Sequence, residues 1–288
     1  MNKPIEKIFQ RPAKPGMVGD GFRVFNYFPG IIPQKRVSPF LMLDFNAEYD
    51  FGISDHLRGV DVHPHKGFET VTIAYKGSVA HHDSTGNSGI INPGDVQWMT
   101  AGAGILHKEY HEEEFSKRGG PFEMVQLWVN LPAKDKLTPP KYQPITAAEM
   151  GKVELANNGG HVNVIAGNLN GISGPAFTYT PVNMFDIRIN KGGELSTNIL
   201  ATHNTVMLVV SGSATINGET VGTHAFALFK NEGEQIDIKA HEDSVLLLLS
   251  GEPINEPIAQ YGPFVMNSSA ELQEAFDEFN AGKFGYLE

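Results

Sequence analysis

The stretch that decides the fold begins His63-Pro64-His65-Lys66-Gly67-Phe68-Glu69 and ends Gly104-Ile105-Leu106-His107-Lys108-Glu109. Between these ends, residues 70–75 and 96–100 are rich in the β-branched and aromatic side chains that favour strands. The sequence Asn92-Pro93-Gly94-Asp95 between the two runs favours a tight turn, because proline presets the backbone angle that such a turn needs. The stretch therefore predicts short strands joined by tight turns, with histidine and carboxylate side chains at both ends.

The composition of the whole chain is that of a folded, largely β-structured protein. Hydrophobic residues make up 41% and charged residues 19% of the 288 residues, which indicates a soluble globular protein and not a disordered one. The 31 glycines and 18 prolines are spread along the chain. Turn signals return about every 8–12 residues, which is the spacing of a β-sandwich or barrel. We expect an all-β fold.

The length allows two domains, and the best candidate for their boundary is the segment 131–145. Its four prolines and three lysines suit an extended linker. We therefore expect an N-terminal domain over residues 1–140 and a C-terminal domain over residues 141–288. Near the C-terminus, residues 268–271 fit a helix capping box and are followed by apolar residues at helical spacing, which predicts an amphipathic helix that packs on the β core.

Charge and cysteine content exclude several classes of function. The 22 basic and 33 acidic residues give a net charge of −11, and no run of lysine or arginine is present, so we expect no direct nucleic-acid binding. The absence of cysteine excludes disulfides, thiolate metal sites and cysteine nucleophiles. The sequence has neither a signal-peptide core nor an apolar run of membrane-spanning length, which predicts a cytoplasmic protein that does not enter the membrane.

Two pairs of candidate metal ligands follow the alternation of a β-strand. His63 and His65 are two residues apart, and so are His107 and Glu109. Side chains at i and i+2 point to the same face of a strand, with Cα atoms about 6.6–6.8 Å apart, so each pair can converge on one ion. If the two strands pair or face each other, they form a site with three nitrogens and one oxygen. Such ligands suit iron, manganese, nickel, copper or zinc, and positions remain for water, substrate or dioxygen.

Longer motifs resemble those of the pirin family of the cupin superfamily. They lie at residues 38–44, 63–71, 92–102, 104–109, 126–132, 261–267 and 282–285. The resemblance covers essentially the whole chain. It implies a bicupin, which has two jelly-roll β-barrels, with an iron(II) ion in the N-terminal barrel.

The resemblance also assigns the ligands, which fall on His63, His65, His107 and Glu109. Cupins in general often use a glutamate four residues after the second histidine, which makes Glu69 the alternative oxygen ligand. The pirin pattern favours Glu109 and leaves Glu69 to support a ligand by hydrogen bonding. The C-terminal half contains neither a His-x-His nor a His-x-Glu pair, so we expect its barrel to lack metal ligands.

Two further features lie outside the predicted ligand set. After Asp44 the chain has Phe45-Asn46, where the family often has an acidic residue followed by an aromatic one. The sequence His81-His82-Asp83 can be part of the pocket wall or a solvated turn, and the turn is the favoured interpretation.

The resemblance implies oxygenase chemistry, because pirin-like bicupins resemble quercetin 2,3-dioxygenases, which open the central ring of a flavonol with dioxygen and release carbon monoxide. The expected partners are then a small aromatic or flavonol substrate and dioxygen. Glu109 is expected to be catalytic, by taking the proton of the flavonol 3-hydroxyl. The alternative is a regulatory role, since some pirins are iron-dependent redox-sensing proteins that bind a transcription factor or a metabolic enzyme. An open, partly apolar cavity beside the metal would favour catalysis.

Overall fold

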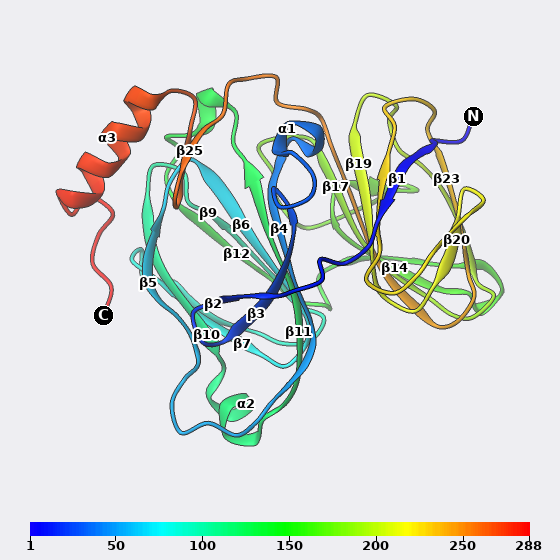
Figure 1. The fold of residues 1–288 in the computed structure, drawn as a ribbon, viewed down its shortest axis with the longest axis horizontal. Helices are drawn as coiled ribbons and strands as arrows, with labels where there is room; N and C mark the ends of the chain where they lie inside the picture. Colours follow the sequence, from blue (N-terminus) through cyan, green and yellow to red (C-terminus); the bar gives the residue numbers. More distant parts are fainter. The chain divides into compact units, whose positions relative to one another are not determined.

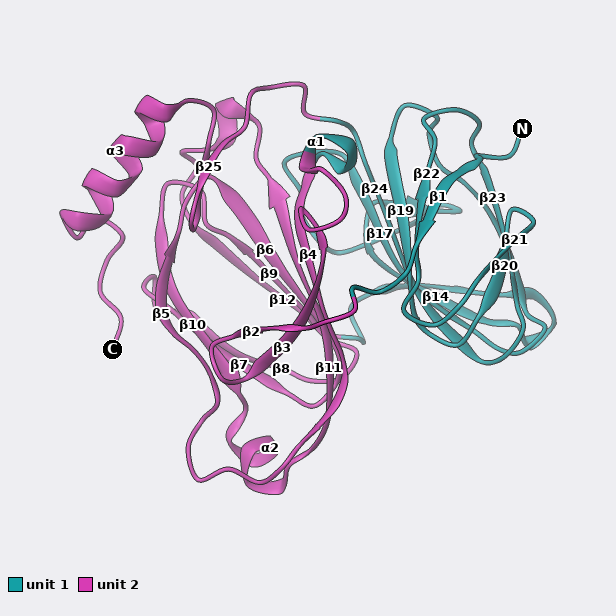
Figure 2. Cartoon of the chain, viewed as in Figure 1, with its two compact units in different colours: residues 1–12, 35–39, 147–253 teal, residues 13–34, 40–146, 254–288 magenta.

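The computed structural model describes all 288 residues, which form two compact units that are discontinuous in sequence (Figure 1, Figure 2). The N-terminal barrel contains residues 13–34, 40–146 and 254–288. The C-terminal barrel contains residues 1–12, 35–39 and 147–253. The division predicted from the sequence, residues 1–140 and 141–288, is a single cut, whereas the two units exchange their terminal segments.

The N-terminal barrel consists of two antiparallel sheets. One sheet has seven strands, in the order β12 (Lys141–Ile145), β9 (Val96–Thr100), β6 (Phe68–Lys76), β11 (Gly120–Asn130), β4 (Phe40–Phe51), β3 (Phe22–Phe28) and β2 (Gly16–Val18). The other has four, in the order β5 (Gly59–His65), β10 (Ile105–His111), β7 (Val79–Asp83) and β8 (Ser88–Ile91). A separate hairpin is formed by β25 (Ala259–Tyr261) and β26 (Phe264–Met266).

The C-terminal barrel has the same two kinds of sheet. Its seven-stranded sheet has the order β1 (Ile5–Phe9), β22 (Phe226–Phe229), β19 (Asn204–Ser211), β24 (Ser244–Gly251), β17 (Val182–Ile189), β14 (Gly160–Ala166) and β13 (Gly151–Glu154). Its four-stranded sheet has the order β18 (Glu194–Asn198), β23 (Gln235–Ala240), β20 (Ala214–Ile216) and β21 (Glu219–Val221). A short pair, β15 (Asn168–Leu169) and β16 (Ile172–Ser173), lies outside these sheets.

The strand orders of the two barrels correspond place by place. Every strand from β2 to β11 has a counterpart at the same place in the C-terminal barrel. The edge place of β12 is taken in the C-terminal barrel by β1, the first strand of the chain. The predicted all-β fold with two jelly-roll barrels is therefore confirmed.

The segment 131–145 is not the extended linker that its prolines predict. It begins with a short 3-10 helix, η1 (Ala133–Asp135), and ends with β12, which pairs with β9. Proline lacks a backbone N–H and is therefore confined to the edges of sheets. Pro144 is accommodated because β12 is the edge strand of its sheet.

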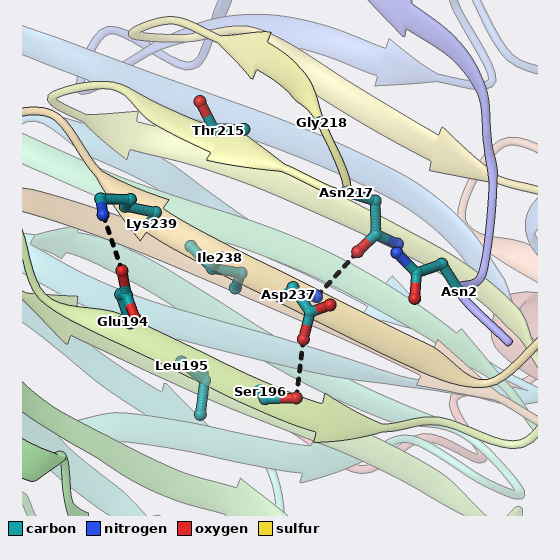
Figure 3. A pocket seen from close by; sticks show the side chains of 10 residues that line it. All are labelled: Asn2, Glu194, Leu195, Ser196, Thr215, Asn217, Gly218, Asp237, Ile238 and Lys239. Atoms are coloured by element: carbon teal, nitrogen blue, oxygen red, sulfur yellow. Dashed lines mark hydrogen bonds and ion pairs between the residues drawn. The ribbon is translucent and has the colours of Figure 1, made fainter.

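The interior of the C-terminal barrel is filled with apolar side chains. Its strands β18 and β23 hold the places of β5 and β10. On these two strands, buried side chains alternate with exposed or half-buried ones. The buried ones are Leu195, Thr197, Ile236, Ile238 and Ala240. The opposite face carries polar side chains, and the Ser196 hydroxyl donates to Asp237 while Lys239 pairs with Glu194 (Figure 3). The strands that carry histidines in one barrel thus carry a hydrophobic core in the other.

The helices are few and short. They are α1 (Gln34–Val37), α2 (Glu113–Arg118), a 3-10 helix η2 (Ala156–Asn158) and α3 (Ser269–Asn280). The predicted capping box of α3 is present, because the Ser268 hydroxyl accepts a hydrogen bond from the backbone N–H of Glu271 (3.3 Å) and the Glu271 carboxylate accepts one from Asn267 (3.0 Å). No helix combines the length and the apolar character needed to cross a membrane.

The C-terminal segment packs against β10. A small hydrophobic cluster joins Phe264, Ala275 and Phe284, with Leu106 of β10 packed against it. Gly104, just before β10, has φ +128°, and a Cβ atom at this position would lie 2.2 Å from a ring carbon of Phe284. Glycine is therefore required here both by the backbone angle and by the close approach of the Phe284 ring.

Glu69 lies on the opposite face of β6 from Thr72, because residues three apart in a strand point to opposite faces. The Thr72 hydroxyl lies 3.2 Å from Oε1 of Glu109, whereas Oε1 of Glu69 accepts a hydrogen bond from Thr100 (2.7 Å). Glu69 is 1% exposed. Burial raises its pKa to about 7, although the hydrogen bond from Thr100 acts in the other direction.

The Gly104→Ala variant should lower the thermal midpoint of metal-free protein more than Gly86→Ala does. Gly86 also has a positive φ (+87°), but no atom lies within 4 Å of a Cβ built there. Both variants place a Cβ atom on a residue with positive φ, which costs about 1–2 kcal/mol. Only Gly104→Ala also overpacks its surroundings, which costs about 1–3 kcal/mol more. Equal midpoints for the two variants would show that the C-terminal segment does not pack tightly on Gly104.

The Glu69→Gln variant should change how stability depends on pH. Between the unfolded pKa of 4.5 and the folded pKa of about 7, only the unfolded chain releases the proton of Glu69, so this residue destabilises the fold as pH rises. Glutamine keeps an acceptor for Thr100 but does not titrate. The stability of the variant relative to the wild type should increase across this window, by at most about 1.4 kcal/mol per pH unit. Denaturant unfolding of metal-free protein at pH 5, 6, 7 and 8 measures this, and a constant difference would contradict the assignment.

Candidate metal centre

Three histidines meet where β5 pairs with β10. The antiparallel register places His107 directly opposite His63, and His65 follows on the same face of β5. The ring centroids are 4.2 Å apart for His63 and His107, 4.8 Å for His65 and His107, and 4.9 Å for His63 and His65. One nitrogen from each ring lies within 4.8 Å of the others, so the three rings can hold one metal ion.

The histidines are held in states that suit metal binding. Nδ1 of His63 lies 2.8 Å from the carbonyl oxygen of Asp61, to which it can donate, and this leaves Nε2 free. Burial first, and the neighbouring histidines second, hold the pKa of His107 well below its ordinary value, and burial has the same effect on the pKa of His65. Both rings are therefore neutral at neutral pH, as metal ligation requires. Neither ring nitrogen of the buried His107 has a protein partner, and a bound metal would satisfy one of them.

Glu109 is fixed through one of its carboxylate oxygens. Oε1 accepts a hydrogen bond from Nε2 of Gln97 (3.1 Å), and the Thr72 hydroxyl lies 3.2 Å from the same oxygen. These contacts leave Oε2 as the oxygen that can bind a metal or accept a proton. The register of β5 and β10 shifts between His107 and Glu109, and Glu109 lies opposite Val60. Glu109 groups with His107 and His81 within 4.8 Å, so the four predicted ligands belong to two overlapping groups that share His107.

His81 belongs to one group of candidate ligands, a place that the favoured interpretation of the sequence did not give it. The predicted solvated turn at residues 81–83 is wrong, because these residues end β7, where His81 lies opposite Glu109 and is fully buried. Nε2 of His81 lies 3.3 Å from Oδ2 of Asp83, and its ring stacks on Tyr142 with the centroids 4.9 Å apart. Nδ1 of His81 has no protein partner. The short run Val79-Ala80 after a Gly-Ser turn is the only sequence signal for this strand.

Asp83 is held as a carboxylate beside His81. Burial alone would raise its pKa, but hydrogen bonds from His81, Thr85 and Asn87 outweigh burial and lower the pKa of Asp83 to about 2. The carboxylate lies beside Nε2 of His81, so His81 can donate to it from this nitrogen and keep Nδ1, which has no protein partner, as an acceptor.

Glu69 does not take part in the cluster. It belongs to neither group of candidate ligands, and its side chain points to the other face of β6. The prediction that Glu69 supports a ligand by hydrogen bonding is wrong, because its partner is Thr100. Sequence spacing alone gave no indication of which face of the strand would turn inward.

A cavity of about 310 Å³ opens beside the candidate ligands. His63, His65 and Glu109 form part of its wall. Most of the remaining wall is apolar and consists of Val18, Phe22, Val24, Met42, Val60, Met124, Trp128 and Pro263. Three polar side chains complete it, Asp44, Asn46 and Gln126. The volume is at the lower end of the roughly 300–1,000 Å³ range of small-molecule sites.

The donor set is suited to a divalent first-row transition metal. Imidazole nitrogens and a carboxylate oxygen are ligands that iron, manganese, nickel, copper and zinc all accept. The apolar cavity on one side of the cluster leaves room for a small molecule next to the ion. The arrangement can therefore position an organic substrate against a metal and a carboxylate in a partly dry environment.

Comparison with known proteins gives a consistent result for both barrels. Residues 21–129 match the family described as Pirin, and residues 184–285 match the Pirin C-terminal cupin domain. A Pseudomonas aeruginosa protein named "Putative quercetin 2,3-dioxygenase" is 46% identical over 267 residues, which cover 93% of each chain.

Solved structures agree with the sequence matches. The crystal structure of quercetin 2,3-dioxygenase from Acinetobacter baumannii is 45% identical, covers 99% of both chains and superposes with a TM-score of 0.94. The bacterial pirin YhhW from Escherichia coli, solved in complex with nickel(II), is 23% identical, covers 86% of this chain and 100% of its own, and has a TM-score of 0.64, which shows a shared fold. From the family matches in both halves and the high identity over nearly the full length, the chain belongs to the pirin family.

Proposed function

We propose that this pirin is a metal-dependent dioxygenase that opens the central ring of a flavonol such as quercetin with dioxygen. The observation that supports this most directly is the apolar cavity with His63, His65 and Glu109 in its wall. A regulatory metal site has no need for a cavity of this kind, whereas a catalytic one must bind a substrate beside the ion. The names of the similar Pseudomonas and Acinetobacter proteins support the same class of reaction.

The proposed metal ligands are His63, His65, His107 and Glu109, and the proposed metal is iron(II). Manganese, nickel, copper and zinc suit the same ligands, and the related E. coli pirin binds nickel(II). When bound, the metal would supply a Lewis acid that polarises the substrate oxygen and a centre that brings dioxygen to the substrate.

The chain's own residues would bind the flavonol and move one proton. Glu109 would take the proton of the 3-hydroxyl on Oε2, while Gln97 and Thr72 hold Oε1 in place. The apolar side chains of Phe22, Met42 and other cavity residues would contact the flat rings and exclude water. The two atoms of dioxygen enter the ring-opened product, and one carbon of the central ring leaves as carbon monoxide.

Iron-loaded protein, purified without oxygen, should consume quercetin when oxygen is admitted, which is followed by the loss of flavonol absorbance. Glu109→Gln should lower kcat/KM by about 10²–10⁴-fold, because the amide cannot accept the proton. Glu69→Gln is the matched control, since it changes another buried glutamate of the same barrel, on β6 in the other sheet, and should keep activity within a few-fold. Unchanged absorbance with fully loaded protein and oxygen would reject the proposal and favour the redox-sensing alternative.

Elemental analysis of protein purified without a nickel column should identify the bound metal and test the ligands. The His107→Ala variant should lose this metal, because His107 belongs to both groups of candidate ligands. The His241→Ala variant changes an exposed histidine of the C-terminal barrel and should retain it. Equal metal contents in the two variants would place the metal elsewhere.

A further inference from the structure

The cavity wall formed by β4 and β11 carries polar side chains that no metal ligation requires. Asp44 lies opposite Gln126 and Asn46 lies opposite Met124 in the register of these strands, and all four residues line the cavity. The Thr72 hydroxyl lies 3.0 Å from Oε1 of Gln126 and 3.2 Å from Oε1 of Glu109. The pair Asp44–Gln126 is therefore close to the candidate ligand Glu109. Asn46 lies two residues further along β4, so its Cα atom is about 6.6–6.8 Å from the Cα atom of Asp44.

Asn46 is a buried amide without partners. It is 1% exposed, and neither its Oδ1 nor its Nδ2 has a hydrogen-bond partner in the protein. Leaving a buried polar group unpaired destabilises the fold, and an aliphatic side chain of similar size would avoid this cost. The last torsion of asparagine is broad, so the amide can turn either its donor or its acceptor toward the cavity. A ligand in the cavity is the partner that this side chain lacks.

Asp44 offers a second polar group on the same wall. Its Oδ1 accepts a hydrogen bond from Nδ2 of Asn26 (2.7 Å), and its Oδ2 has no protein partner. Asn26 is itself anchored, because it donates to the carbonyl of Phe28 and accepts from the N–H of Gly30. The carboxyl group is therefore held in one position with one oxygen free. Such an oxygen can bind a hydroxyl group in either protonation state of Asp44, because a hydroxyl donates to a carboxylate and accepts from a carboxylic acid.

Much of the rest of the cavity lining is apolar. Phe22, Val24, Met42 and Met124 lie among the cavity residues and offer no hydrogen bond to a ligand. A molecule that fills the cavity must therefore be largely apolar, with polar groups where Glu109, Gln126, Asp44 and Asn46 lie.

We propose that Asp44 and Asn46 form a binding subsite for ring hydroxyl groups of an aromatic substrate that lies in the cavity beside the metal ligands. The inference rests on the proposed function and names its substrate class, which is a flat polyhydroxylated aromatic molecule with an enol at the metal ligands and far hydroxyls, on its outer rings, at Asp44 and Asn46. An analogue that lacks the far hydroxyls leaves two buried polar groups unpaired, and sites of this kind reject such analogues strongly. The subsite thus selects polyphenols over unsubstituted flavonols.

The test compares quercetin, which carries hydroxyls on its outer rings, with 3-hydroxyflavone, which lacks them. Binding to metal-loaded protein is measured by titration without oxygen, so that no turnover occurs. Asn46→Leu and Asp44→Asn should each weaken quercetin binding by about tenfold, which corresponds to the loss of about 1.4 kcal/mol, and should leave 3-hydroxyflavone binding within twofold. Met42→Leu is the matched control, because it changes an apolar residue of the same wall and should affect both ligands alike.

The wild-type protein provides a test that does not depend on how a variant folds. Flavonols from which single outer-ring hydroxyls are removed should bind progressively more weakly. Equal affinity for quercetin and 3-hydroxyflavone, or an equal loss for both in Asn46→Leu and Asp44→Asn, would overturn the subsite. Selective binding of quercetin without its consumption in air would uphold the subsite and reject the dioxygenase. Consumption of both flavonols at equal efficiency would uphold the dioxygenase and overturn the subsite.

Discussion

The pairing of β5 with β10 is the constraint on which the candidate site depends. It places His107 opposite His63 and brings three imidazoles into one small volume, in which His65 and His107 are buried. Buried ring nitrogens without partners are costly, and the rings stay neutral because charging them there would cost more. A metal ion relieves this cost, since it accepts the lone pairs that the surrounding protein leaves unused. The same interior position that makes the histidines poor bases thus makes them good ligands.

The two barrels show that the fold by itself does not create the site. They share their strand order, yet the strands that match β5 and β10 fill the C-terminal barrel with leucine and isoleucine side chains. A packed core of this kind stabilises its barrel but leaves no space for a ligand. The N-terminal barrel replaces part of that core by polar ligands and a cavity. Function therefore depends on which inward-facing side chains a strand carries, and this differs between two copies of one architecture.

Much of this could be predicted from the sequence, because strands and paired ligands follow a local alternation. The strand at Val96–Thr100 and the turn at residues 92–95 lie where local propensity places them. His63, His65 and His107 come together because two short motifs each have the period of a strand. These features need only neighbouring residues to be recognised.

The features that the sequence did not reveal depend on which strands are neighbours. His81 joins the cluster through its register with Glu109 on β10, and nothing in the sequence His81-His82-Asp83 fixes that register. The inward face of β6 is set by its partners on both sides, so Glu69 could not be placed before they were known. Pro144 suggested a linker, since proline is rare inside sheets. The edge position that accommodates it is a property of the whole sheet and cannot be recognised from neighbouring residues.

The exchange of terminal segments has a consequence for how the protein is made. The first strand of the chain, β1, completes a sheet whose other strands are synthesised more than a hundred residues later. The N-terminal barrel in turn receives its last segment, with α3 and Phe284, from the end of the chain. The C-terminal barrel can therefore be completed once residue 253 has been synthesised, whereas the N-terminal barrel must wait for residues 254–288. A gene divided at the midpoint would yield two fragments that each lack a piece of their own fold.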